Sequence, residues 1–420
     1  MMEKQTKIGT VPSGWIKKKL KDVFYINEFS LPSNTPADYQ FKYITIEQVS
    51  TNQIDYGNCE TFRFSDAPGR ARRIVRDNDI LISGVRPNLK SFAIFNNPDA
   101  GSWICSTGFF VLTAKNEDDN LISYYELLSE IGERQFYSYV AGSNYPAIGD
   151  SDIRNIRLVL PSSVKEKTAI ANILSKVDEA IAAVQGSIAA AERLKESLMQ
   201  NLLTGRMKPD GTLRKEDEFY MDEKFGKVPI GWEVKRIDEI AERKTDVIDP
   251  TKTKEVYDYI GLEHIIPDEF TRCGKGLSNE TVALKVKFEK GDLLYGKLRP
   301  YLNKVFISDI SGVGSTEFIV LKQNKFTNWV YLNFQLQRFL DYTKSMTAGT
   351  QHPRASWKDI KHYLVCVPKD EQEKESIENK LLSLEQYKTS QSAKIEMLER
   401  LKKSLMQNLL TGKVKANNHK

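Results

Sequence analysis

Two stretches of the chain, residues 163–203 and 370–410, carry apolar residues at alternating steps of three and four positions. A repeat of 3.5 residues is typical of a helix that packs against another helix in a coiled coil. Neither stretch contains proline, and each follows a proline and precedes a glycine, as helix boundaries often do. We therefore predict two long helices, each a rod of roughly 60 Å.

The apolar seam of each helix identifies the residues expected at the helix–helix interface. One lysine, Lys195, interrupts the first seam, and the polar residues Lys388 and Gln391 interrupt the second. The predicted interface residues are Leu174, Val177, Ile181, Val184, Ile188, Leu198, Leu202, Leu381, Leu384, Ile395, Leu398, Leu405 and Leu409.

A different pattern fills residues 11–160 and 228–367, which come before the two helices. Short runs of β-branched and aromatic residues, such as 79–83, alternate with Gly, Pro, Asn and Asp, which predicts strands joined by turns. Residues 121–135 and 329–342 have helical spacing with aromatic residues on one face, so we expect helices that cover the sheets. The predicted fold class is α+β.

An internal repeat relates the two halves of the chain. Residues 192–205 return as residues 399–412, 207 positions later, with only Glu196 changed to a lysine. Shorter matches precede the helices, among them Pro-x-Gly-Trp, Arg-Pro and Ala-Gly…Pro, so the chain consists of two copies of one unit. In the Arg-Pro segment, Arg86 aligns with Arg299 and Lys90 with Lys304. The predicted division is a first α+β domain at 1–162, a central helix at 163–205, a linker at 206–227, a second α+β domain at 228–368, a distal helix at 369–412 and a tail at 413–420.

The near-identity of the two helices suggests how their seams are buried. An antiparallel coiled coil within the chain would bury both seams and relate the two units by a pseudo-twofold axis. The alternative is that each helix forms a homodimeric coiled coil with another copy of the chain.

Composition sets limits on the class of protein. No window approaches the ~18 uninterrupted apolar residues of a membrane span, and the polar N-terminus is not followed by a signal core, so we expect a cytoplasmic protein without a membrane partner. The four cysteines and four histidines are scattered, and we predict no disulfide and no metal site. The net charge of +5 is compatible with a nucleic-acid partner but does not require one.

The motifs of common enzyme classes are missing from the sequence. It contains no phosphate-binding G-x-x-x-x-G-K-[ST], no G-x-S-x-G, no H-E-x-x-H, no dinucleotide-binding glycine turn and no Asn/Asp-Pro-Pro-aromatic tetrapeptide. We therefore predict no catalytic residues and a non-enzymatic role.

Polar loops that occur in both units are the candidates for function. One loop follows a predicted strand and places Arg, Lys and Asn around a proline; a second loop shares an Ala-Gly…Pro frame but differs inside it. Arginine can pair with phosphate or guanine, and asparagine with adenine, so we interpret the loops as two readers of two different DNA sequences. The predicted DNA-binding residues are Arg86, Asn88, Lys90, Ser143, Asn144, Tyr145, Arg299, Tyr301, Lys304, Thr350, Gln351, His352 and Arg354.

These features together resemble a known family. Two variable domains, each followed by a helix that ends in Leu-Met-Gln-Asn-Leu-Leu-Thr-Gly, are similar to the specificity subunit of Type I restriction–modification systems. The Pro-x-Gly-Trp, Tyr-Ile-Gly-Leu-Glu and Arg-Pro-Tyr-Leu motifs add to this resemblance. It covers nearly the whole chain, although the first unit departs from it at Thr45–Gln48 and at Asn88.

The resemblance implies a specific function. Each α+β domain would be a target recognition domain that reads one half of a bipartite, asymmetric site in double-stranded DNA. The antiparallel coiled coil would set the gap between the half-sites and dock two methyltransferase subunits, and two motor–nuclease subunits would complete the complex. No cofactor is expected on this chain, since S-adenosylmethionine, ATP and magnesium would belong to those partners. The alternatives are a structural adaptor that does not bind DNA, or a specificity subunit for a fused nuclease–methyltransferase.

Overall fold

The computed structural model describes residues 11–99, 101–140, 146–346 and 353–416. The chain divides into two compact units. Unit 1 contains Met1–Gly186 and Ala393–Lys420, and unit 2 contains Ser187–Ser392. Each unit therefore holds one α+β domain together with one part of each long helix, α5 (Val164–Leu202) and α10 (Glu371–Leu409).

Two four-stranded sheets build the α+β domain of unit 1, with strand orders β6-β3-β10-β7 and β2-β11-β8-β9. The strand that begins the domain, β1, pairs antiparallel with β12, the strand that leads into α5. The strands are β1 Trp15–Lys19, β2 Phe24–Ile26, β3 Gln40–Ile44, β4 Val49–Ser50, β5 Gln53–Ile54, β6 Glu60–Arg63, β7 Ala71–Ile74, β8 Ile80–Ser83, β9 Phe92–Ile94, β10 Trp103–Ser106, β11 Phe109–Ala114 and β12 Arg157–Pro161. The helices are α1 Leu20–Val23, α2 Asn120–Leu128, α3 Glu130–Val140 and α4 Asp150–Asn155.

Unit 2 repeats this plan with sheets ordered β16-β24-β21-β22 and β17-β20-β23-β18-β19, and with β15 paired to β25 before α10. The linker adds a two-stranded sheet, β13–β14. The strands are β13 Phe219–Asp222, β14 Gly226–Pro229, β15 Trp232–Arg236, β16 Arg243–Lys244, β17 Val247–Ile248, β18 Asp258–Ile260, β19 Gly276–Leu277, β20 Lys285–Phe288, β21 Leu293–Gly296, β22 Val305–Ile307, β23 Gly312–Ser315, β24 Phe318–Leu321 and β25 Leu364–Pro368. The helices are α6 Ile237–Ile240, α7 Thr327–Phe334, α8 Gln337–Met346 and α9 Trp357–Ile360.

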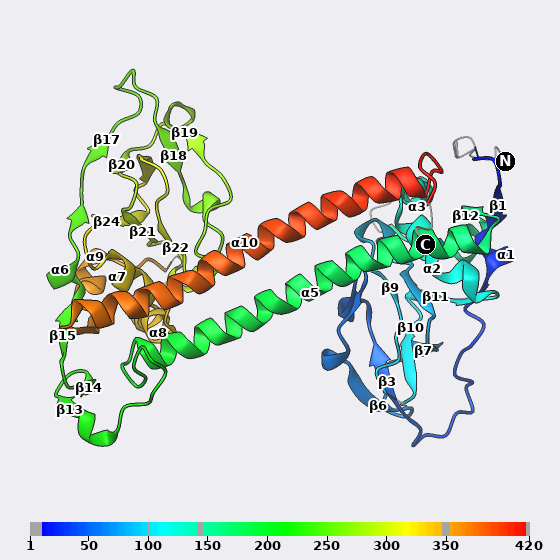
Figure 1. The fold of residues 1–420 in the computed structure, drawn as a ribbon, viewed down its shortest axis with the longest axis horizontal. Helices are drawn as coiled ribbons and strands as arrows, with labels where there is room; N and C mark the ends of the chain where they lie inside the picture. Colours follow the sequence, from blue (N-terminus) through cyan, green and yellow to red (C-terminus); the bar gives the residue numbers. More distant parts are fainter. Residues whose placement is uncertain (1–10, 100, 141–145, 347–352, 417–420) are drawn as a thin grey trace. The chain divides into compact units, whose positions relative to one another are not determined.

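The long helices α5 and α10 (Figure 1) meet inside the chain: their ends share a core in each unit, and ion pairs join them, Lys195 with Glu385, Lys388 with Glu192 and Lys402 with Asp178. In unit 1, Leu174 near the start of α5 shares a core with Leu409 at the end of α10. In unit 2, Leu202 at the end of α5 shares a core with Leu381 near the start of α10. The pairing is therefore antiparallel and intramolecular, which confirms the predicted fold class.

All thirteen predicted interface residues are at least partly buried. Six are buried, namely Leu174, Val177, Val184, Leu202, Leu381 and Leu409. The other seven are half-buried, namely Ile181, Ile188, Leu198, Leu384, Ile395, Leu398 and Leu405. The predicted residues therefore lie on the less exposed faces of both helices.

Two repeated motifs meet in each unit. Gly205 follows α5 with φ +68°, and a Cβ added there would lie 2.2 Å from Cγ of Pro229. Gly412 follows α10 with φ +65°, and its added Cβ would lie 2.7 Å from Cγ of Pro12. The end of each helix therefore lies against the Pro-x-Gly-Trp motif that begins a domain, and glycine is required by both the backbone angle and the space.

The predicted covering helix at residues 329–342 is in fact two helices, α7 and α8, and the one predicted at residues 121–135 is likewise two helices, α2 and α3. Ser129 lies between them in an extended conformation (φ −67°, ψ 165°), and its Oγ accepts a hydrogen bond from the N–H of Gly132. This is the geometry of a serine that caps a new helix. The prediction of one helix was wrong because apolar periodicity continues across the cap.

Candidate nucleic-acid interface

The first predicted loop forms the same strained turn in both units. Arg86 follows β8 and Arg299 follows β21, and both have left-handed backbones, with φ of 48° and 52°. A proline then starts a short 3-10 turn, η3 (Pro87–Leu89) or η8 (Pro300–Leu302). Left-handed residues other than glycine cost about 1–3 kcal/mol each, so the surrounding structure must hold this loop in place.

The residue at the end of the turn shows that the predicted alignment of the two units is wrong by one position there. Lys90 and Asn303 occupy this place, again with left-handed backbones (φ 51° and 42°). Lys90 is therefore the counterpart of Asn303 and not of Lys304. The error arose because both segments contain a lysine near the turn, one residue apart in the true register.

The prolines of the second predicted loop, Pro146 in unit 1 and Pro353 in unit 2, lie directly beside the first loop. The N–H of Arg86 donates to the carbonyl of Pro146 at 2.7 Å, and the N–H of Arg299 donates to the carbonyl of Pro353 at 2.8 Å. In each unit, two segments far apart in sequence thus form one composite surface. Of the residues predicted to bind DNA, Ser143, Asn144, Tyr145, Thr350, Gln351 and His352 lie outside the described residues.

Four predicted side chains of this surface are exposed and point to a role in binding. Arg86 and Asn88 are exposed in unit 1, and Arg299 and Tyr301 are exposed in unit 2. Among the described residues, no hydrogen bond or ion pair holds the guanidinium of either arginine. Both can therefore turn toward an external phosphate or base.

Three other predicted side chains already have partners in the protein. Lys90 Nζ lies 3.0 Å from Glu133 Oε2 and donates to the carbonyl of Leu128. Lys304 Nζ donates to the carbonyl of Leu262 at 2.6 Å, and burial lowers its pKa. Arg354 forms an ion pair with Glu317 at 3.1 Å. The two lysines hold the loop in place, whereas Arg354 remains largely exposed.

The structure adds candidates that the sequence analysis missed. Lys297 lies in the first loop of unit 2. Burial lowers its pKa, and the nearby charges of Glu317, Arg243 and Arg354 also affect this pKa. In unit 1, the exposed aromatic side chain of Tyr137 lies on α3, the helix that leads to the second loop. Neither carried a sequence signal, since an isolated lysine or tyrosine is common on any surface.

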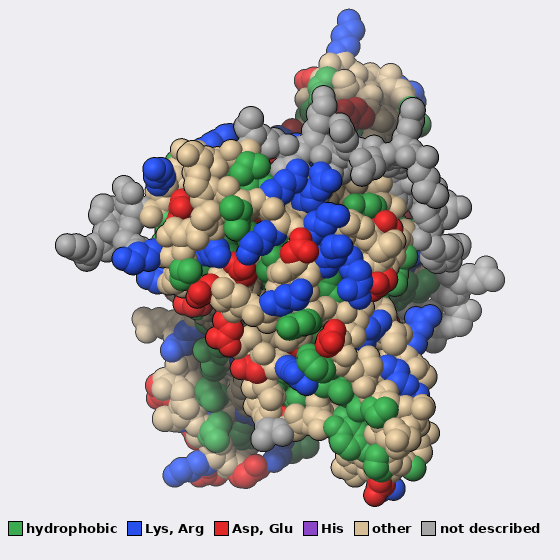
Figure 2. Space-filling model, turned by 90° about the vertical axis from the view of Figure 1, so that its right-hand side faces the viewer, with side chains coloured by type: hydrophobic (Ala, Val, Ile, Leu, Met, Phe, Trp, Pro, Cys, Tyr) green, Lys and Arg blue, Asp and Glu red, His purple; other side chains and the backbone are tan. Residues whose placement is uncertain are grey.

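Basic side chains also gather on a face of unit 1. Lys and Arg are concentrated in the middle of the view in Figure 2, which looks at the side of unit 1 that carries β1. Three successive lysines, Lys17–Lys19, end that strand. Lys18 forms an ion pair with Asp119, and Lys19 donates to Asn155. In the basic run at residues 70–76, Arg76 lies over the ring of Phe29, 3.3 Å from its centroid, so these basic groups also serve packing within the domain.

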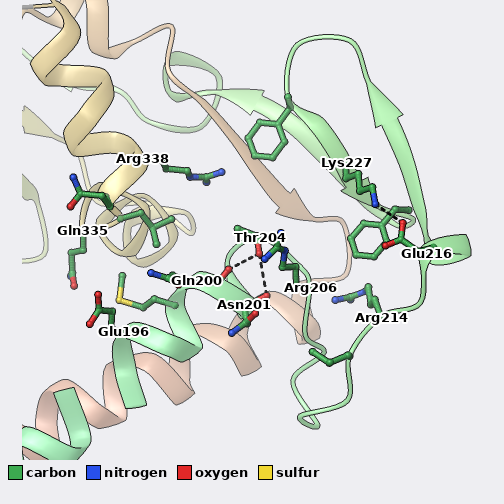
Figure 3. Close-up of a pocket in the computed structure, with 16 residues that line it drawn as sticks. Glu196, Gln200, Asn201, Thr204, Arg206, Arg214, Glu216, Lys227, Gln335 and Arg338 are labelled. Atoms are coloured by element: carbon green, nitrogen blue, oxygen red, sulfur yellow. Dashed lines mark hydrogen bonds and ion pairs between the residues drawn. The ribbon is translucent and has the colours of Figure 1, made fainter. Parts of the chain in front are cut away.

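A cavity of about 870 Å³ opens in unit 2 where α5 ends, the linker begins and α8 starts (Figure 3). Its lining mixes charges of both signs, and several are already paired: Lys227 with Glu216, and Arg214 with Glu373. Arg214 also donates to the carbonyls of Gly205 and Met207. These contacts fasten the linker to the end of α5.

Two buried acids, Asp79 and Glu126, have pKa values raised by burial. Burial raises the pKa of Asp79 to about 6, and its carboxylate accepts hydrogen bonds from the N–H of Arg76 and the hydroxyl of Thr113. Burial raises the pKa of Glu126, on α2, to about 8.

Among the described residues, no group of three or more His, Cys, Asp or Glu is arranged to hold a metal ion. None of the described helices has the length and apolar character needed to cross a membrane.

Comparisons with known proteins agree with this architecture. Residues 12–193 and 229–400 match the family model described as the type I restriction modification DNA specificity domain. A Methanocaldococcus jannaschii chain named for the MjaX specificity subunit of a type I restriction enzyme is 22% identical over 436 residues, which cover 98% of this chain and 96% of that one. The EcoDI specificity subunit of a type I restriction enzyme from Escherichia coli is 27% identical over 254 residues, which cover 54% of each chain.

Solved structures share the fold. The S subunit of a type I restriction–modification system from M. genitalium matches with a TM-score of 0.59 at 15% identity, over 97% of this chain and 98% of that one. A chain solved in a study of assembly and conformational transition of the type I R-M system matches with a TM-score of 0.53 at 18% identity, over 97% of this chain and 100% of that one.

Proposed function

We propose, from the premise that this chain belongs to the type I restriction–modification DNA specificity family, that it is the DNA-recognition subunit of such a complex and performs no catalysis itself. Each α+β domain reads one half of a bipartite, asymmetric site in double-stranded DNA. The observation that carries this proposal is the composite loop surface built the same way twice, with an exposed arginine, Arg86 or Arg299, in each copy.

The composite surface suits recognition because its frame is shared and its exposed groups differ. Each strained turn holds the arginine backbone in place, so the flexible guanidinium can form a bidentate pair with guanine or phosphate. At the equivalent place in the turn, unit 1 presents Asn88 and unit 2 presents Tyr301. An amide pairs with adenine edges, whereas a phenol ring offers stacking and one hydroxyl, so the two units would select different bases.

The helix pair would serve as spacer and docking surface. The segments 192–205 and 399–412 are nearly identical even where side chains face solvent, as Leu194 and Leu401 do. Packing within the chain does not demand an exposed leucine twice, whereas two copies of one partner would. We assign this surface to two methyltransferase subunits, which two motor–nuclease subunits would join. S-adenosylmethionine, ATP and magnesium would act on those partners.

A domain exchange tests the proposal. Replacing residues 11–160 with the corresponding domain of another family member, in complex with the partner methyltransferase, should change the methylated sequence at one half-site only. A change at both half-sites would contradict the modular reading. Assembly with partners that never depends on DNA, at any salt concentration, would favour the adaptor alternative.

Point substitutions test the two arginines. Arg86→Ala or Arg299→Ala should weaken specific binding by about 1–3 kcal/mol if the side chain reads guanine. If it contacts phosphate instead, binding should weaken on all sequences and the salt dependence should decrease by about one charge. The exposed, ion-paired Arg236 of β15 supplies the control Arg236→Ala, which should change neither quantity.

A further inference from the structure

The lysine that interrupts the first helix seam is part of a polar cluster that occurs in both units. In unit 2, Lys195 of α5 forms an ion pair with Glu385 of α10 and donates to Gln335 Oε1 at 2.7 Å. In unit 1, Lys402 of α10 lies 2.5 Å from Asp178 of α5. The two lysines are 207 positions apart in the sequence, and so are the two acids. The cluster is therefore repeated, with the roles of the helices exchanged.

Each cluster also binds the α+β domain of its unit. The hydroxyl of Tyr125, on α2, donates to Asp178 Oδ2 at 2.9 Å. The hydroxyl of Tyr331, on α7, donates to Glu385 Oε2 at 3.0 Å. Three separate segments, α5, α10 and a domain helix, thus meet at one carboxylate. We name these clusters the unit 1 joint (Tyr125, Asp178, Lys402) and the unit 2 joint (Tyr331, Glu385, Lys195).

A loop of each domain reaches the same joint through a residue with a left-handed backbone. In unit 1, Asn52 (φ 65°) donates from Nδ2 to Asp178 Oδ1 at 3.2 Å. In unit 2, the ring of Phe270 (φ 57°) lies 5.1 Å below Lys195 Nζ. A left-handed phenylalanine is an uncommon and strained backbone state. In unit 2 the domain therefore accepts backbone strain at Phe270 to touch the joint, whereas Asn52 adopts the left-handed region readily.

The joints distinguish one helix register from others. The side chains of the two ion pairs retain only 12–22% of their exposure. If one helix slid along the other by a heptad, a charge would remain in an apolar seam without its partner. A partly buried ion pair contributes little net stability compared with apolar packing, but an unpaired buried charge is strongly unfavourable. Such groups are best known for selecting one register among several.

We propose that the two joints are positioning devices, which lock the helix register and seat each recognition domain on the helix pair. By fixing the helix register and the positions of the domains on the helices, they determine how strictly the complex requires one gap length between the DNA half-sites. The inference rests on the proposed function, because a gap can be read only if each domain binds a half-site. The residues in question would touch no DNA base, and their effect would appear in gap tolerance and not in base choice.

The test compares methylation by the complete complex on DNA with the native gap and with gaps one base pair longer or shorter. In the wild type the native gap should be strongly preferred. Lys195→Met with Lys402→Met should reduce that preference about tenfold, and Tyr125→Phe with Tyr331→Phe should reduce it in the same direction while keeping both rings in the core. Lys195→Arg with Lys402→Arg, which keeps a cation beside each carboxylate, should retain the preference.

Two controls separate this inference from simpler outcomes. Lys176→Met removes an exposed charge from α5 close to Asp178 and should leave the gap preference unchanged. The bases required within each half-site should be the same in every variant. Folded joint variants that retain the wild-type gap preference would overturn the inference alone. A wild-type complex that methylates without regard to sequence would overturn the proposed function instead.

Discussion

The contact between the end of α5 and the Pro-x-Gly-Trp motif of unit 2 makes a quantitative prediction. In Gly205→Ala the new Cβ would meet Pro229 Cγ at 2.2 Å, while the backbone would have to keep φ +68°. A left-handed alanine costs about 1–2 kcal/mol. Overpacking against a ring that cannot easily move adds about 1–3 kcal/mol. We therefore expect a loss of roughly 2–5 kcal/mol in the stability of unit 2.

A second glycine of unit 2 supplies the matched control. Gly211 has φ +91°, but nothing lies within 4 Å of its added Cβ. Gly211→Ala should therefore show only the backbone cost, about 1–2 kcal/mol. The difference between the two variants isolates the contact with Pro229.

Urea unfolding followed by tryptophan fluorescence measures both variants, since Trp232 lies in the core of unit 2. The midpoint should fall further for Gly205→Ala, at an unchanged denaturant slope. Adding Pro229→Ala should recover the part of the loss that comes from the clash, as a double-mutant cycle would show. Equal losses for Gly205→Ala and Gly211→Ala would refute the contact between helix end and motif.

Three further predictions concern buried groups. Leu174→Ala should destabilise the helix pair by about 2–5 kcal/mol in urea unfolding, whereas Leu194→Ala, at an exposed site, should change stability by less than about 0.5 kcal/mol. Burial raises the folded-state pKa of Glu126 from 4.5 to about 8, so its neutral form is stabilising; stability should fall as pH rises from about 4.5 to 8, and Glu126→Gln should remove that part of the pH dependence. Arg214→Met should cost roughly 3 kcal/mol because it removes the cation beside Glu373 and leaves that carboxylate only the indole N–H of Trp232, whereas Lys227→Met at an exposed pair should cost at most about 1 kcal/mol by the same measurement; equal effects would contradict the role of Arg214 in fastening the linker.

Local sequence patterns predicted only part of the candidate site. The repeated Arg-Pro segments marked both loops, because a proline-stiffened turn after a strand is a local pattern. The alignment of Lys90 with Lys304 was wrong, because register within a turn depends on which residue adopts the left-handed backbone. That choice follows from packing around the loop, such as the contact of Lys90 with Glu133 on α3.

The joints illustrate the same limit. Lys195 stood out as a polar interruption of the first seam, but its partner could not be named from the sequence. Glu385 lies 190 positions away and meets Lys195 only because the helices are antiparallel and in this register. Tyr331 is one of several aromatic residues on its helix, and only the fold brings its hydroxyl to Glu385.

The sequence by itself determined the duplication, the two long helices and their inward faces, because these follow from periodicity and from near-identical segments. Only the tertiary structure decided which loops adjoin, which basic side chains remain available to bind, and which carboxylate each buried lysine meets. Those relations depend on contacts between residues far apart in the chain. Local patterns do not encode them, since many pairings satisfy the same local preferences and packing selects one.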